Sequence, residues 1–188
     1  MDRRAQILDA ARRLLLQHGP GNVTVADIAR EAGVGVGSVY LEYRSKDEIL
    51  IALSSQRYEH VLAAMRRAAR EAADPGERPR SILRARLRAF LTLAEDGAHG
   101  PELLHCYCPA VEEAWRRFTA AEEAILAEAI AGGVVAGALQ GEPDEAAEAV
   151  LAACATFSPP LLCKRRPSDV LARAERLFSL LLDGLRRR

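Results

Sequence analysis

Apolar residues recur at helical spacing along most of this 188-residue chain, and glycine and proline mark the breaks between the helical segments. Ile7, Ala11, Leu14 and Leu15 follow the i, i+4, i+7, i+8 pattern of one helical face, and Gly19 ends it. The chain is rich in Ala, Leu, Arg and Glu, which form helices well, whereas strands favour β-branched and aromatic residues. The sequence therefore predicts an all-α protein.

Capping signals and breaks divide the chain into helical segments. Thr24 with Asp27, and Ser45 with Glu48, have the spacing of a capping box at the start of a helix. Residues 97–109 are less regular, and a short helical turn is predicted between Pro101 and Pro109. The predicted helices cover about residues 25–32, 36–43, 46–73, 81–95, 110–139 and 144–157, and a last helix follows Pro167 with Ser168 as its N-cap.

Two of these helices are short, follow each other directly and are joined by a tight turn at Gly33. Together with the amphipathic helix before them, they are typical of a helix-turn-helix that reads DNA, although an ordinary pair of packed helices has the same spacing. Ile28, Ala32 and Val39 stand where these helices would pack. Residues 1–46 hold seven basic and five acidic side chains and the whole chain has no net charge, so charge alone does not predict nucleic-acid binding.

The amino-acid sequence of this segment is a more specific signal than the spacing of its helices. Residues 23–34 read VTVADIAREAGV, residues 37–40 read GSVY, and Tyr43, Lys46 and Leu50 follow. Over about residues 5–53 the chain resembles the TetR family of transcriptional regulators. The resemblance implies a helix-turn-helix DNA-binding domain at residues 1–46 and a helical effector-binding and dimerisation domain at residues 47–188. It also implies that a small-molecule effector changes the separation of the two DNA-reading heads of a homodimer, which then leaves a double-stranded DNA operator. Repression is the common mode in the family, but activators also exist.

The resemblance also assigns DNA contacts. Thr24 and Tyr40 offer hydroxyl groups to phosphates, and Lys46 adds a cation at the N-terminus of the long helix. Tyr43 stands where phenylalanine is usual and adds a further hydroxyl. Phosphate contacts position the protein, whereas base edges are read by the start of the second short helix. The candidate DNA-binding residues are Thr24, Gly35, Val36, Ser38, Tyr40, Tyr43 and Lys46.

The base-reading face differs from that of common family members. Ala26 and Val36 occupy positions where relatives often carry polar side chains, and Gly35 replaces a capping Ser or Thr. Glu42 stands where His is frequent and would repel a phosphate. We therefore expect specificity to come from thymine methyl contacts, DNA shape and an arm that carries Arg3 and Arg4.

The second domain is harder to interpret. An effector pocket would be lined by apolar and aromatic residues, which favours a mostly apolar effector, although aromatic residues are more often part of a core. The candidates are Phe90, Leu93, Leu104, Tyr107, Trp115, Phe118 and Phe157. The last two helices supply the candidate dimer interface, which in the family is a four-helix bundle, although the same residues could face their own core. These are Val150, Leu151, Cys154, Leu171, Ala174, Phe178, Leu181 and Leu185.

Histidine and cysteine gather in one short segment, at His99, His105, Cys106 and Cys108, with Cys154 and Cys163 further along. Thiolate and imidazole groups suit zinc or copper(I), but the His-Cys-x-Cys run has no matching second pair. We expect reduced thiols, no metal site and no cofactor. A metal or redox role for His105, Cys106 and Cys108 stays open.

Other classes of function have less support. The sequence contains no glycine-rich phosphate loop, no H-E-x-x-H and no G-x-S-x-G, so we expect no catalysis. A protein-interaction adaptor that kept the fold and lost DNA binding stays open, because the base-reading face has few polar groups. No apolar stretch reaches the roughly 18 residues of a membrane span, and charges interrupt the basic N-terminus. We expect a cytoplasmic protein without a membrane partner.

Overall fold

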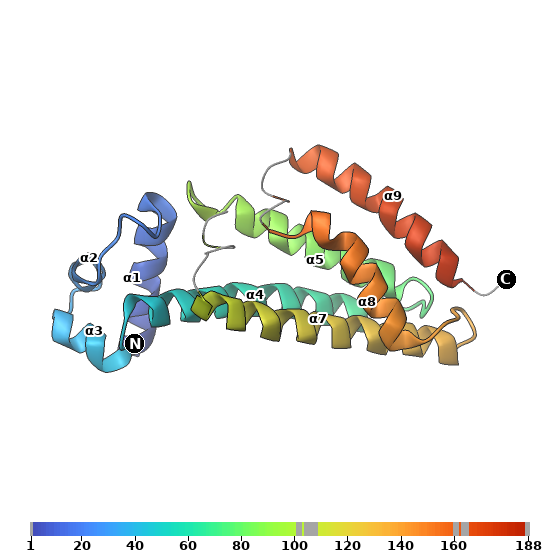
Figure 1. The fold of residues 1–188 in the computed structure, drawn as a ribbon, viewed down its shortest axis with the longest axis horizontal. Helices are drawn as coiled ribbons and strands as arrows, with labels where there is room; N and C mark the ends of the chain where they lie inside the picture. Colours follow the sequence, from blue (N-terminus) through green and yellow to red (C-terminus); the bar gives the residue numbers. More distant parts are fainter. Residues whose placement is uncertain (1, 101–102, 104–108, 160–161, 163–165, 187–188) are drawn as a thin grey trace. The chain divides into compact units, whose positions relative to one another are not determined.

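The computed structural model describes residues 2–100, 103, 109–159, 162 and 166–186, and its regular elements are helices (Figure 1). Within this described part, one isolated β-bridge joins Leu139 to Arg186. The helices are α1 (Arg3–His18), α2 (Val25–Glu31), α3 (Val36–Glu42), α4 (Lys46–Glu71), α5 (Arg78–Ala94), α7 (Pro109–Val135), α8 (Pro143–Ala153), the 3-10 helix η1 (Cys154–Phe157) and α9 (Pro167–Leu185). The all-α prediction is confirmed.

The chain forms two compact units. The first consists of Met1–Tyr58 with Leu93–Arg116, and the second of Glu59–Thr92 with Arg117–Arg188. The first unit thus extends past the predicted domain boundary after residue 46, into α4, and takes in a segment from the middle of the chain. The boundaries between the units fall inside α4, α5 and α7.

The first unit has its own apolar core. Helix α1 contributes one buried face, and α2, α3 and the first half of α4 pack against it. Leu103 and Val111 come from the mid-chain segment and belong to the same core, which explains why that segment joins this unit. The core residues include Ile7, Ala11, Leu15, Ile28, Ala29, Val39, Ile49, Leu53, Leu103 and Val111.

Local hydrogen bonds set the ends of these helices. Asp2 accepts from the backbone N–H of Arg4 at 3.2 Å and caps α1, and Gly19 ends that helix with a positive φ of 78°. The second predicted capping box differs from the expected form. The Glu48 N–H donates to the Ser45 hydroxyl at 3.2 Å, but the Glu48 carboxylate accepts from the N–H of Arg44, at 2.7 Å.

The second unit is built around aromatic and aliphatic side chains of α5, α7, α8 and α9. Phe90 meets Phe118 edge to face with ring centres 5.6 Å apart, and Phe157 meets Phe178 at 6.4 Å. A charged pair, Arg86 and Glu122, is buried in the same interior. Other buried members of this core are Ile82, Leu83, Leu87, Leu126, Ile130, Val150, Val170 and Ala174.

Several helix ends differ from the sequence prediction, and α5 begins at Arg78 instead of near residue 81. Helix α7 ends at Val135, four residues before the predicted end, and Gly137 follows with a φ of 71°. Helix α8 ends at Ala153 and continues as η1. The prediction of Ser168 as the last N-cap was wrong: α9 begins at Pro167 and its N-cap is Arg166. Proline is favoured at the first helical position, because its fixed φ suits a helix and its missing N–H would have no partner there.

Candidate nucleic-acid interface

The helix-turn-helix of α2 and α3 lies in the first unit, next to α1 (Figure 1). The Thr24–Asp27 capping box is present: the Asp27 N–H donates to the Thr24 hydroxyl at 3.2 Å, and the Thr24 N–H donates to the Asp27 carboxylate at 3.0 Å. Hydrogen bonds from Thr24, and then the charge of Arg30, hold the pKa of Asp27 below its ordinary value. Gly33 makes the turn with a φ of 67°, and the Val34 N–H donates to the Ala29 carbonyl.

Helix α3 presents apolar side chains to solvent. Val36 is 43% exposed, Tyr40 51% and Leu41 82%, whereas Ser38 is half-buried. Val39 on the opposite side of the helix is buried in the core of the first unit. Gly35 is the N-cap and has no side chain to satisfy the first N–H groups, as the sequence predicted. The exposed face therefore offers methyl and phenol groups for contact.

Tyr43 does not stand free to contact a phosphate. Its side chain is only 1% exposed, its hydroxyl donates to the Arg4 carbonyl at 3.4 Å, and burial raises the pKa of its phenol. The guanidinium of Arg4 lies 4.3 Å from the centre of its ring. A phosphate contact by Tyr43 stays a prediction; in this structure the ring joins the N-terminus of α1 to the C-terminus of α3.

Arg3 and Arg4 do not form an arm. Both lie in the first turn of α1, and Arg4 Nη1 donates to the carbonyl of Glu42 at 2.7 Å. A cation at the last carbonyls of a helix is favourable, so Arg4 caps α3 from outside. The expected DNA-reading arm is therefore corrected, and Arg3 remains as an exposed cation at the start of α1.

Of the other three predicted phosphate contacts, Tyr40 is exposed, and two already have partners within the protein. Lys46 Nζ donates to the carbonyl of Pro20, which holds the loop between α1 and α2. The hydroxyl of Thr24 donates to Asp27 at 2.6 Å. Sequence reasoning missed Arg44, which directly follows Tyr43, is exposed and has a guanidinium without an ion pair in the described part of the chain. Its position in the sequence, two residues after the end of α3, could have marked Arg44 as a candidate DNA contact.

The candidate pocket residues fall in both units. Phe90, Phe118 and Phe157 form the aromatic pairs of the second unit. In the first unit, Trp115 meets Tyr58 edge to face at 5.5 Å, and the Leu93 carbonyl accepts from buried Arg57 at 2.6 Å. Leu104 and Tyr107 lie outside the described residues.

The candidate dimer residues divide by burial. Four of them lie in the core of their own chain: Val150, Cys154, Ala174 and Phe178. Such side chains have almost no surface to offer a partner. Leu151, Leu171, Leu181 and Leu185 keep part of their surface, and Leu180, which sequence reasoning did not select, is largely exposed on α9.

Most of the histidines and cysteines for which a metal or redox role stayed open lie in segments that the structure does not describe. His105, Cys106, Cys108 and Cys163 lie outside the described residues, and within the described part no three His, Cys, Asp or Glu residues gather as a metal site would require. Cys154 is a buried thiol, and burial raises its pKa to about 11. Among the described helices, none combines the length and apolar character needed to cross a membrane.

Comparison with known proteins agrees with this geometry. Residues 7–53 match the family described as "Bacterial regulatory proteins, tetR family". The chain is 31% identical to the HTH-type transcriptional regulator TtgR of Pseudomonas putida over 156 residues, which cover 78% of this chain and 73% of TtgR.

Solved structures show the same fold. A transcriptional regulator of the TetR/AcrR family from Thermobifida fusca has a TM-score of 0.75 and 26% identity over the full length of both chains. FadR from Bacillus subtilis, solved in complex with stearoyl-CoA, has a TM-score of 0.70 and 22% identity over 96% of this chain and 98% of its own. With the helix-turn-helix intact and the match to TtgR extending over most of both proteins, the chain belongs to the TetR family of DNA-binding transcriptional regulators, a family of regulators and not of enzymes.

Proposed function

We propose that the protein is a ligand-responsive repressor that binds a palindromic operator as a homodimer and leaves it when a small, mostly apolar effector binds its helical C-terminal domain. The observation that carries this proposal is the helix-turn-helix whose second helix, α3, turns Val36, Tyr40 and Leu41 to solvent. TtgR supports a role in transcription, and FadR, a protein of the same fold, was solved with a small molecule bound.

A gel shift with the DNA upstream of the protein's own gene tests the DNA-binding part. Phosphate contacts release counterions, so the affinity should fall steeply as the salt concentration rises. Tyr40→Phe removes only the exposed phenol oxygen and should weaken binding, whereas Arg88→Ala, at an exposed position on α5, is a control that should have no effect. A protein that shifts no DNA at any salt concentration would be the interaction adaptor instead.

A further part of the proposal concerns which bases of the operator the protein prefers. Because α3 exposes methyl groups at Val36 and few polar groups, we expect thymine methyl contacts and DNA shape to set the preferred sequence. Selection from a randomised half-site library would measure this. Strong guanine preferences at most positions would contradict it, because guanine is read mainly by Arg or Lys donors.

The dimer is expected to use the surface that α8 and α9 keep exposed. Sedimentation of the wild type should give twice the chain mass, and Leu180→Glu should shift the equilibrium toward monomers, because a charge would be buried on association. Leu41→Glu is the matched control, since Leu41 is equally apolar and exposed but lies on α3. Equal behaviour of the two variants would exclude α9 from the interface.

The effector is expected to be rich in carbon, because Phe90, Phe118, Phe157 and Phe178 line the interior of the second unit. Compounds that raise the melting temperature of the protein should also release the shifted DNA. A compound that binds tightly and strengthens the DNA complex would instead indicate an activator or a co-repressor mode.

A further inference from the structure

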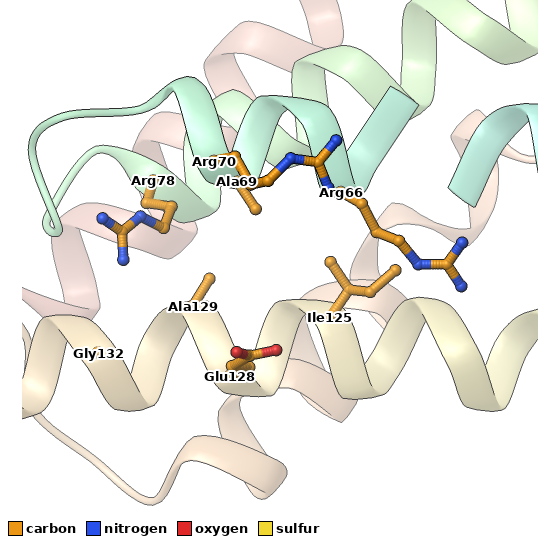
Figure 2. Close-up of a pocket in the computed structure, with 8 residues that line it drawn as sticks. All are labelled: Arg66, Ala69, Arg70, Arg78, Ile125, Glu128, Ala129 and Gly132. Atoms are coloured by element: carbon orange, nitrogen blue, oxygen red, sulfur yellow. The ribbon is translucent and has the colours of Figure 1, made fainter. Parts of the chain in front are cut away.

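A cleft of about 460 Å³ opens in the second unit between α4, the start of α5 and α7 (Figure 2). None of the apolar pocket candidates lines it, so it is distinct from the aromatic interior described above. Its lining residues are Arg66, Ala69, Arg70, Arg78, Ile125, Glu128, Ala129 and Gly132.

The charges around this cleft are unbalanced. Figure 2 shows Arg66, Arg70 and Arg78 on the side of α4 and α5, and Glu128 across from them on α7. Arg66 is bound to Glu59 at 2.6 Å. Arg78 donates from Nε and Nη2 to the Ala72 carbonyl, a neutral acceptor. Neither Arg70 nor Arg78 has a carboxylate partner in the described part of the chain.

This imbalance is local. Residues 59–92 contain eight arginines and four acidic residues, although the whole chain has no net charge. Other arginines of the segment are neutralised by carboxylates: Arg84 binds Glu175 through two contacts of 2.6 and 2.7 Å, and Arg86 binds Glu122. Even with Glu128 in the lining and Arg66 paired with Glu59, the three arginines of the cleft leave it a net positive charge.

The walls between the charges are small and apolar. Ala69, Ala129 and Gly132 leave the space open, and Ile125 adds an aliphatic surface. A Cβ atom at Gly132 would lie 3.5 Å from Arg78 Nη1 and would meet no other atom within 4 Å. The Ala72 carbonyl holds Nε and Nη2 of Arg78, and Nη1 faces α7 near Gly132. The space is larger than one inorganic ion needs, so a ligand can have a body as well as a charged group.

We propose that this cleft binds a small organic anion with two or more negative charges on phosphate or carboxylate groups. Arg70 and Arg78 hold the anion, and Arg66, which also binds Glu59, is a further contact. Guanidinium groups bind both kinds of oxyanion through paired N–H donors. The site goes beyond the proposed function, because its ligand is charged and the effector of the repressor is mostly apolar.

Titration calorimetry on the full-length protein without DNA tests the site, with pyrophosphate as the phosphate probe and citrate as the carboxylate probe. We expect saturable binding of at least one probe at one site per chain, and the probe that binds identifies the oxyanion. Arg70→Gln changes an exposed side chain that forms no ion pair within the described residues, so it should fold normally, and it should weaken binding about tenfold. The double variant Arg70→Gln/Arg78→Gln should abolish binding.

Two further variants separate the cleft from general attraction to positive charge. Arg88→Gln removes an exposed arginine of α5 that does not line the cleft and should leave the affinity unchanged. Gly132→Leu keeps every charge and fills the cleft, so it should prevent binding while circular dichroism shows an unchanged helix content. Absence of saturable binding, or equal weakening by Arg70→Gln and Arg88→Gln, would overturn the proposal. Because no DNA is present, this outcome is independent of whether the protein represses transcription.

Discussion

Arg86 and Glu122 form a charge pair in the interior of the second unit, where both side chains are buried. Arg86 Nη2 donates to Glu122 at 3.2 Å and to the Ser158 hydroxyl at 2.8 Å, and its guanidinium lies 4.9 Å from the centre of the Phe90 ring. These partners satisfy donors that would otherwise be lost on burial. Taking two charges out of water is costly, so burial of this pair is by itself weak evidence that the pair stabilises the fold.

Removing one charge of this pair should change the free energy of unfolding differently from removing both. Glu122→Ala leaves the Arg86 charge buried without a counter-charge and should lower the free energy of unfolding by about 3–5 kcal/mol. The double variant Arg86→Met/Glu122→Leu removes both charges and should cost less than the single one. Urea denaturation measures both values. A double variant that is less stable than Glu122→Ala would show that the pair itself is strongly stabilising.

A second prediction at the residue scale concerns Cys154. Its pKa is raised to about 11 by burial, so at pH 7.5 the thiol is protonated and hardly reacts, and its reactivity should increase as the pH approaches 11. Iodoacetamide treatment of the native protein, followed by mass spectrometry of the Cys154 peptide, should show little labelling until urea unfolds the chain. Rapid labelling under native conditions at pH 7.5 would contradict the buried position.

At the scale of single elements, α7 contains two adjacent glycines in different surroundings. A Cβ atom at Gly132 would be in ordinary contact with Arg78 alone, whereas one at Gly133 would lie 2.5 Å from Cδ1 of buried Leu139 and 3.2 Å from the Pro75 carbonyl. Glycine weakens a helix, so the sequence alone would count both as defects. Only the packing of the loop after α7 distinguishes them.

Alanine substitutions should therefore have opposite signs at these two positions. Gly132→Ala should raise the free energy of unfolding by up to about 1 kcal/mol through helix propensity. Gly133→Ala should lower it by about 1–2 kcal/mol, because the clash with Leu139 and Pro75 exceeds that gain. Thermal denaturation of the two variants side by side provides the comparison. If both substitutions stabilise the protein, the Leu139 side chain can move away from a Cβ atom at position 133.

At the scale of the whole molecule, contacts between distant segments define the first unit. Gly97 has a φ of 77°, and a Cβ atom there would lie 3.0 Å from Leu16 Cβ and 3.1 Å from the Leu16 carbonyl. The His99 N–H donates to that carbonyl at 3.0 Å. The chain thus returns from α5 to the end of α1, and Leu103 joins the core of the DNA-binding helices. We therefore expect Gly97, from the middle of the chain, to affect the stability of the unit that contains the helix-turn-helix.

Gly97→Ala should show this connection, and Gly137→Ala is its matched control. Both glycines have a positive φ, which costs an alanine about 1–2 kcal/mol, but a Cβ at Gly137 meets nothing within 4 Å. Gly97→Ala should be the more destabilising by about 1–3 kcal/mol, because the Leu16 contact adds a steric cost. It should also speed hydrogen exchange in α1, which Gly137→Ala should leave unchanged. Equal effects would indicate that Leu16 adapts.

The sequence by itself determined the helices, their caps at Gly19, Gly35 and Thr24, and the family of the DNA-binding segment. These features depend on residues no more than four positions apart or on a contiguous motif, so local spacing is sufficient to predict them. The place of Val36 on the base-reading face came from the resemblance to the family, and the structure leaves this side chain 43% exposed.

Only the tertiary structure decided which side chains are available for contact. It buried Tyr43 against Arg4, occupied Lys46 with Pro20, and placed four of the proposed dimer residues in their own core. It also brought Arg86 to Glu122 and placed Arg70, Arg78 and Gly132 around one cleft. The partners of Tyr43, Lys46 and Arg86 lie 39, 26 and 36 residues away in the chain. Helical periodicity specifies which face of a helix is apolar but not which distant element will cover it.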